Sequence, residues 1–210
     1  MRLRKVKNIE EKIKQFAGII VFEPQLIKGK WKEEFTNNNP IYLEIGTGKG
    51  NFIVQHALKN PDINFIGCEV SNSVIYKAAI KGQKIANLRL INIDASLLKD
   101  VFVGEEIAQI YLNFSDPWPK ARHEKRRLTS SIFLELYKNI LVKQGIIELK
   151  SDNQHFFEYS VLKFNEQKWD FLEINLDLHK EVTTEIITTE YEEKFKEIGK
   201  TIYYIKVRIN

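Results

Sequence analysis

The feature that most limits the possible folds of this chain is a regular alternation of short apolar runs with longer amphipathic stretches from residue 41 onward. Short apolar runs are typical of buried strands, whereas the longer stretches have the length of helices. Strands that alternate with helices favour a parallel sheet with crossover helices. The predicted strands of this pattern are Ile41–Gly46, Ile63–Val70, Leu88–Asp94, Ile107–Phe114 and Ile146–Lys150.

The pattern changes toward the end of the chain. Two strand-like runs, Trp169–Leu178 and Thr201–Ile209, are separated there by a polar segment, so these strands are able to pair antiparallel. The chain is therefore predicted to have an α/β fold, with a mostly parallel sheet, helices on both faces and an antiparallel C-terminal strand. The helices expected between the strands are Asn51–Lys59, Ser71–Ala86, a short turn after Asp94, Thr129–Lys143 and Gln154–Gln167.

The length of the chain indicates one core. A chain of 210 residues holds one sizeable α/β domain, but not two ordinary domains and a linker. The polar, turn-rich patch Thr36–Pro40 separates this core from what precedes it. We predict a basic N-terminal arm, partly helical or disordered, at residues 1–39 and a single domain at residues 40–210. The arm residues that could help to hold a polyanion are Arg2, Arg4, Lys5 and Lys7.

Charge and hydropathy give no sign of a membrane protein. The net charge of +4 permits a polyanionic partner without requiring one. No segment is long and apolar enough to cross a bilayer, and the N-terminus lacks the apolar centre of a secretory signal. The single cysteine, Cys68, lies in an apolar strand and is predicted to fill the core. The expected location is the cytoplasm.

A glycine-rich turn follows the first predicted strand and precedes a predicted helix. It contains Gly46, Gly48 and Gly50, and glycines in this place let a ligand lie against bare backbone at the carboxyl edge of the sheet. The alternative is a plain strand-to-helix turn. A dinucleotide-binding turn has the spacing G-x-G-x-x-G, whereas the third glycine here comes two residues after the second, which disfavours NAD.

Acidic side chains stand at the ends of three successive strands. Glu44 lies just before the glycine turn, Glu69 ends the second strand and Asp94 ends the third. In a parallel sheet these carboxylates share one edge, where they suit the cationic amino acid end, the ribose hydroxyls and the adenine of S-adenosylmethionine. As separate solvated loop acids they would be unremarkable. A metal site is disfavoured, and none is predicted, because no histidine or cysteine cluster joins them.

The most informative segment, Asn113–Leu128, follows the fourth strand. Two prolines flank Trp118 there, and they restrict the backbone that carries Asp116 and this indole. A carboxylate can accept hydrogen bonds from the N1–H and the amino group of guanine, and an indole offers a face for base stacking. The alternative for Trp118 is an ordinary core aromatic residue.

Positive charge is concentrated directly after this turn. Such a run is often only a solvated face, but beside a predicted site for base chemistry it favours phosphate binding. The residues of this basic cluster are Lys120, Arg122, Lys125, Arg126 and Arg127.

Four motifs together resemble the bacterial tRNA (guanine-N7-)-methyltransferase family: Glu44–Gly50, Asn113–Leu128, Ser151–Asn153 and Thr189–Glu192. The resemblance implies the Rossmann-like fold of S-adenosylmethionine-dependent methyltransferases and a guanosine in the tRNA variable loop as substrate. The sequence departs from the usual wording of the family where it has Ser115 for proline, Ala121 for lysine and Ser151 for threonine.

The resemblance also implies roles for individual residues. It implies that S-adenosylmethionine contacts Glu44, Glu69, Asp94 and Asp116, beside the contacts predicted for Gly46 and Gly48 of the glycine turn. It implies that the substrate contacts Lys120, Asp152, Thr189, Glu190, Tyr191 and Glu192, beside the stacking predicted for Trp118. RNA contact is implied for Arg122, His123, Lys125, Arg126 and Arg127.

The expected activity is methyl transfer to N7 of guanosine, with Asp116 as the catalytic residue, tRNA as the partner and no obligatory protein partner. Asp116 would orient the guanine and stabilise the positive charge that methylation leaves on it. Without the resemblance, helix capping explains Ser151–Asn153 as well as substrate binding does. The alternatives are a non-catalytic tRNA-binding protein on the same fold, or a methyltransferase for another RNA or a small-molecule amine.

Overall fold

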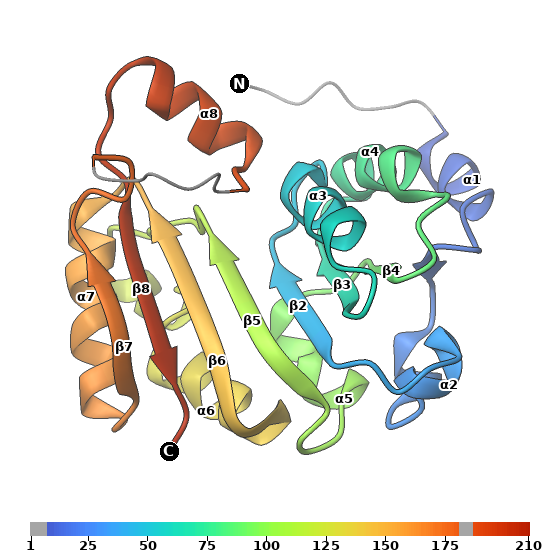
Figure 1. The fold of residues 1–210 in the computed structure, drawn as a ribbon, viewed down its shortest axis with the longest axis horizontal. Coiled ribbons are helices and arrows are strands. Elements are labelled where there is room, and N and C mark those ends of the chain that lie inside the picture. The colour runs from blue at the N-terminus through green and yellow to red at the C-terminus, as the bar shows by residue number, and fades with distance from the viewer. Residues whose placement is uncertain (1–7, 181–186) are drawn as a thin grey trace. The chain divides into compact units, whose positions relative to one another are not determined.

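The computed structural model describes residues 8–180 and 187–210, which fall into two compact units (Figure 1). The first unit ends at Phe102, and the second begins at Val103. The basic residues predicted to serve the N-terminal arm, Arg2, Arg4, Lys5 and Lys7, lie outside the described residues.

The first unit contains four parallel strands in the order β1-β4-β3-β2. The strands are β1 Ile20–Val21, β2 Ile41–Ile45, β3 Asn64–Cys68 and β4 Leu88–Ile91. The last three of these strands confirm the predicted ones, because each is a nearly continuous buried apolar run. The helices are α1 Ile9–Lys14, η1 Pro24–Ile27, α2 Trp31–Phe35, α3 Asn51–Lys59, α4 Asn72–Gly82, η2 Ala95–Leu97 and α5 Leu98–Val101.

Residues before position 40 contribute to the packing of this unit. Strand β1 pairs with β4, and the side chain of Trp31 is fully buried. The indole Nε1 of Trp31 donates a hydrogen bond to the carbonyl oxygen of Val101 at 3.1 Å. The division into an arm at residues 1–39 and a single domain at residues 40–210 stays a prediction.

Helix α4 ends at Gly82 rather than at the predicted Ala86. Gly82 is closely packed, because a Cβ there would lie 2.7 Å from Leu88 Cδ2 and 2.8 Å from Ile19 Cδ1. The bare backbone of Gly82 allows this close approach, and residues 83–87 then connect α4 to β4.

The second unit contains four strands in the order β5-β6-β8-β7. Strands β5 Ile107–Asn113 and β6 Leu141–Ser151 are parallel, whereas β8 Tyr203–Arg208 is antiparallel to both β6 and β7 Asp170–Asn175. The predicted antiparallel C-terminal pair is thereby confirmed. The helices are η3 Ala121–Arg126, α6 Ser131–Ile140, α7 Gln154–Glu166 and α8 Glu190–Glu197.

This unit differs most from the prediction at the end of α6 and in the segment before β8. Helix α6 ends at Ile140 and β6 begins at Leu141, so residues 141–143 are strand rather than helix. The segment between β7 and β8 contains helix α8, which was not predicted. Figure 1 shows α8 beyond the end of the sheet at which β5 and β6 terminate. Among the described residues, no helix has both the length and the apolar character that a membrane span requires.

Candidate functional site

The glycine turn after β2 is held against β3. The backbone N–H groups of Gly46 and Thr47 both donate to the carbonyl oxygen of Cys68, at 2.8 and 3.0 Å. Gly46 and Gly50 have φ values of +80° and +82°, in the left-handed region that favours glycine. A Cβ at Gly50 would lie 2.8 Å from the Cβ of Ala78 in α4. The turn therefore requires glycine both for its backbone conformation and for the close approach of α4.

Two of the predicted carboxylates are bonded to this turn. Glu44 is 2% exposed and accepts a hydrogen bond from Thr47 Oγ1 at 2.6 Å. Glu69, directly after β3, accepts from the backbone N–H of Gly48 at 3.1 Å and from that of Ser71 at 2.8 Å. Glu69 therefore joins the glycine turn to the start of α4.

The third carboxylate, Asp94, lies three residues beyond the end of β4 and is exposed. It accepts hydrogen bonds from the Ser96 Oγ at 2.7 Å and the Ser96 backbone N–H at 2.8 Å. The hydroxyl bond first, and then the backbone bond, lower the pKa of Asp94 below its usual value. The carboxylate is thus held ionised and oriented at this edge.

Strands β2, β3 and β4 are adjacent and parallel, so the three carboxylates share one edge of the sheet, as predicted. These residues fit S-adenosylmethionine. Each carboxylate oxygen has two lone pairs, so Asp94 keeps acceptor capacity for a hydroxyl or amino group beside its two bonds from Ser96, while Glu69 lies bonded to the glycine turn at the same edge. The bare backbone of the glycine turn lets a ligand approach closely at the same edge.

Cys68 is buried at the end of β3, and burial raises the pKa of its thiol far above the usual value. A thiol held protonated is a poor nucleophile and ligand. Cys68 is a core residue, as predicted.

Glu69→Gln is expected to weaken S-adenosylmethionine binding by about tenfold, since hydrogen bonds to a charged group contribute about 1.5–3 kcal/mol. The amide keeps one acceptor oxygen, so it cannot serve the Gly48 and Ser71 amides together. Isothermal titration calorimetry with the cofactor measures the change. The control is Asp62→Asn, an exposed carboxylate that precedes β3; equal losses in both variants would contradict a specific role for Glu69.

Ser96→Ala is expected to raise the pKa of Asp94 toward its usual value, because the hydroxyl is the largest cause of the lowered pKa. The folded-state pKa lies below the unfolded one, so the Ser96 bonds stabilise the fold at neutral pH, and this contribution disappears as the pH falls through the folded pKa. A carboxyl ¹³C NMR titration follows Asp94 directly. An unchanged midpoint would show that the hydroxyl does not hold the carboxylate.

The turn after β5 has an unusual backbone. Phe114 and Trp118 are both in the left-handed region, with φ values of +51° and +41°, which bulky residues rarely adopt. The carboxylate of Asp116 is exposed between them. A bulky residue in this region costs about 1–3 kcal/mol, and such residues cluster at active sites and ligand clamps. The hydroxyl of Ser115, which is buried, has no hydrogen-bond partner within the described part of the chain.

The predicted RNA-binding residues gather around Trp118. The guanidinium carbon of Arg126 lies 4.9 Å from the centroid of the indole ring, and the His123 ring meets this indole edge-on at 5.6 Å. Lys120, Arg122, Lys125 and Arg126 are exposed, whereas His123 and Arg127 are half-buried. The half-buried indole is therefore bordered by the Arg126 guanidinium and the His123 ring, and it is not packed in the core as in the alternative.

Asp152 follows β6 and forms an ion pair with Lys200. The residue that caps α7 is Asn153, whose side chain accepts from the Phe156 N–H at 2.9 Å. Helix capping therefore accounts for Asn153 and leaves Asp152 available for another role.

The motif Thr189–Glu192 forms the start of α8 as a capping box. The Thr189 Oγ1 accepts from the Glu192 N–H at 3.0 Å, and the Glu192 carboxylate accepts from the Thr189 N–H at 3.2 Å. The spacing Thr-x-x-Glu is a helix-start signal, so α8 could have been found from the sequence. Tyr191 is 65% exposed and Glu190 is half-buried, whereas Glu192 is fully buried.

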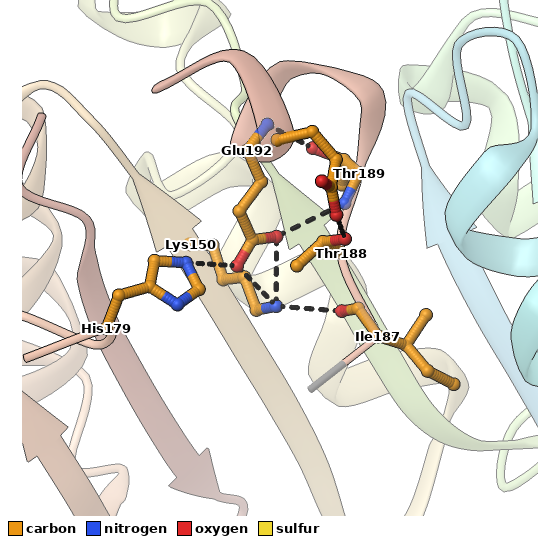
Figure 2. A network of polar contacts seen from close by, with 7 residues as sticks. Lys150, His179, Ile187, Thr188, Thr189 and Glu192 are labelled. Carbon is orange, nitrogen blue, oxygen red and sulfur yellow. Dashed lines mark hydrogen bonds and ion pairs between the residues drawn. The ribbon is translucent and has the colours of Figure 1, made fainter. Parts of the chain in front are cut away.

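Figure 2 shows what the buried Glu192 carboxylate contacts. The ammonium of Lys150, at the end of β6, donates to both carboxylate oxygens at 3.0 and 3.1 Å and to the Ile187 carbonyl at 3.2 Å. His179 Nε2 lies 3.0 Å from the same carboxylate. Lys150 and His179 were not among the predicted site residues, because no sequence motif indicates that either of them contacts a buried carboxylate.

The class of protein follows from the fold and the comparisons. Residues 38–205 match a family model described as "Putative methyltransferase". The crystal structure of the 16S rRNA methyltransferase KamB matches with a TM-score of 0.66 at 12% identity, covering 87% of this chain and 93% of that one. A 16S rRNA (adenine(1408)-N(1))-methyltransferase mutant from Catenulisporales acidiphilia, solved with its cosubstrate SAM, gives a TM-score of 0.61 at 11% identity, covering 99% and 93%. The fold is the Rossmann-like one of S-adenosylmethionine-dependent methyltransferases, as predicted.

Sequence relatives narrow the class. The tRNA (guanine-N(7)-)-methyltransferase of Geobacillus sp. (strain WCH70) is 48% identical over 210 residues, covering 99% of this chain and 96% of the relative. That of Bacillus subtilis (strain 168) is 47% identical over 209 residues, covering 99% and 98%. The chain belongs to the tRNA (guanine-N(7)-)-methyltransferase family.

Proposed function

We propose that the chain transfers a methyl group from S-adenosylmethionine to N7 of a guanosine in the variable loop of tRNA. The observation that carries this proposal is the exposed Asp116 carboxylate on a turn with two left-handed residues, directly after β5. The names of the relatives, at 47–48% identity, support the guanine N7 and tRNA parts of it. The variable loop rests on the family resemblance alone.

In this proposal Glu44, Glu69 and Asp94 hold the cofactor together with the glycine turn. When bound, S-adenosylmethionine supplies a methyl group on a positively charged sulfur. Asp94 accepts hydrogen bonds from its hydroxyl or amino groups beside the bonds from Ser96, and the resemblance implies that Glu69, bonded to the glycine turn at the same edge, contacts the cofactor as well. The buried Glu44, oriented by Thr47, favours a cationic group at the turn.

Asp116 is proposed to contact the guanine, and its contact with the cofactor rests on the family resemblance. The lone pair of N7 forms the new N–C bond while the C–S bond breaks, and because N7 carries no proton, no general base is required. Positive charge moves from the sulfur to the purine. Asp116 accepts hydrogen bonds from the N1–H and amino group and stabilises this charge, while Trp118 offers a stacking face. Lys120, exposed beside this turn, binds the substrate on its phosphate side.

The segment after β6 and the start of α8 complete the proposed guanosine site. Asp152, Thr189, Glu190 and Tyr191 have atoms that reach the surface and are proposed to contact the substrate. The carboxylate of Glu192 is fully buried and bound to Lys150, so we do not propose that it contacts the substrate directly. Glu192 instead acts through its neighbours, by holding the start of α8 in place. A tRNA substrate would place the protein in the cytoplasm, and no obligatory protein partner is proposed.

The test is incubation of the purified protein with methyl-labelled S-adenosylmethionine and unmodified tRNA transcripts, followed by nucleoside mass spectrometry with authentic standards. Label in 7-methylguanosine is expected, and transcripts with substitutions in the variable loop locate the nucleotide. Cofactor binding without label in any tRNA would favour the non-catalytic tRNA-binding alternative. Label in another nucleoside or in a small amine would favour the other methyltransferases.

A further inference from the structure

Arg127 makes contacts unlike those of the other residues in the basic cluster. Its guanidinium donates two hydrogen bonds to the carbonyl oxygen of Trp118, from Nε at 3.2 Å and from Nη2 at 3.0 Å. Trp118 is one of the two left-handed residues of the turn, and its backbone needs support from its surroundings to stay in that conformation. Two charge-assisted hydrogen bonds to its carbonyl supply such support.

The guanidinium of Arg127 is itself fixed by α7. Its central carbon lies 4.3 Å from the centroid of the Tyr159 ring, on the ring face. The Tyr159 hydroxyl donates to Glu124 of η3 at 3.0 Å, and burial, assisted by this bond, raises the pKa of Tyr159 so that the donor proton is retained. Glu124 also lies 3.6 Å from Lys163. Helix α7 thus holds both Arg127 and η3 in place.

These contacts separate Arg127 from its exposed neighbours. Arg122 and Lys125 are exposed, as residues that neutralise RNA phosphates must be, whereas Arg127 is half-buried and directs two of its donors to a protein carbonyl. We propose that Arg127 is a positioning residue that holds Trp118 and Asp116 in the reactive arrangement, and that Arg122 and Lys125 supply the phosphate-binding charge. This inference rests on the proposed function, because it assigns different roles to the cations of the proposed RNA-binding site.

The first experiment uses the full chain and compares Arg127→Lys with Lys125→Met. Lysine keeps the positive charge at 127 but cannot form the two-bonded fork on the Trp118 carbonyl. We expect Arg127→Lys to leave unchanged the slope of log Kd for tRNA against log salt, and to lower the single-turnover methylation rate by roughly ten- to a hundredfold. Lys125→Met is expected to reduce that slope by about 0.7–0.9, the value for one phosphate contact.

A matched control tests whether the loss of any exposed charge has these effects, and a second variant removes the support of Arg127 without changing its charge. Lys143→Met removes an exposed charge at the start of β6 and should change neither slope nor rate. Tyr159→Leu removes the stacking surface under Arg127 and should reproduce the loss of rate without changing the slope. If Arg127→Lys does not fold, Tyr159→Leu carries the comparison.

A readout without tRNA separates this inference from the proposed function. The chain has three tryptophans, so its ¹⁵N spectrum has three indole signals, and Trp118→Phe identifies the signal of Trp118. Arg127→Lys should shift this signal in the tRNA-free protein, and Lys125→Met should not. An unshifted signal would overturn the inference. A further variant, Arg127→Met, removes the charge at 127, and it would also overturn the inference if it reduced the salt slope as Lys125→Met does while the methylation rate was retained. Absence of methylation by the unaltered protein would instead refute the proposed function.

Discussion

Replacing Asp116 with asparagine is expected to lower the single-turnover rate of methyl transfer by about 100- to 1,000-fold, the usual effect of removing a preorganised electrostatic contact from a reacting site. Asparagine has nearly the same shape, so the left-handed residues on either side, Phe114 and Trp118, should keep their conformations. The variant loses the negative charge that stabilises the methylated, cationic purine. It also replaces one acceptor oxygen with an amide donor, which would face the N1–H of guanine.

The measurement is a single-turnover assay with saturating tRNA and cofactor, in which 7-methylguanosine is quantified by mass spectrometry. Glu135→Gln is the control, because Glu135 is an exposed carboxylate on α6 in the same unit. Binding of tRNA by the Asp116 variant should stay within about threefold of the unaltered protein, since phosphate contacts supply most of the affinity. A variant with full turnover would remove Asp116 from the catalytic role.

Replacing Lys150 with methionine is expected to destabilise the protein by about 3–5 kcal/mol, the usual effect of removing one partner from a buried ion pair. Glu192 is fully buried and Lys150 is only 5% exposed, so water cannot replace the lost ammonium. The carboxylate would keep His179 and the Thr189 N–H, but the Ile187 carbonyl would lose its bond from the ammonium. The start of α8 should therefore loosen first.

Denaturant unfolding measures the loss of stability, and amide hydrogen exchange locates it at residues 187–192. The matched variant is the double substitution Lys150→Met with Glu192→Leu, which removes both charges and should recover much of the stability. Lys206→Met is the surface control, because its ion pair with Glu148 is partly exposed and should contribute less than about 1 kcal/mol. A Lys150→Met variant as stable as the surface control would refute the structural role of the pair.

Strands β2, β3 and β4 and helix α3 were predictable because local and tertiary preferences agree there, whereas the two-residue strand β1 was not predicted. Helix α3 spans Asn51–Lys59, the same residues as predicted, since the glycine turn marks its start. The end of α6 was missed because Leu141 and Val142 continue an apolar pattern that suits either a helix or a strand. What separates the two is the pairing of Leu141 with Ile107 of β5, a contact that no local pattern reports.

In the candidate site, too, some features were predictable from the local sequence and others depend on tertiary contacts. The carboxylates at the strand ends were predictable, because parallel strands bring their carboxyl ends to one edge. The separate roles within the basic cluster were not, since Arg127 and Lys125 are equivalent cations in the sequence, and only the position of Tyr159 on α7 distinguishes them. Glu192 was assigned by resemblance to substrate contact, and its burial against Lys150 depends on a residue 42 positions earlier in the chain.

The strand order of the second unit has a consequence for synthesis on the ribosome. Strand β8 lies between β6 and β7, although both of these are made before it. Until residues 203–208 emerge, the edge of β6 that will receive them has no strand to pair with, and neither has β7. A nascent chain stalled before β8 should therefore expose strand edges that chaperones bind and that pair with other nascent chains. The parallel strands of the first unit are by then already synthesised.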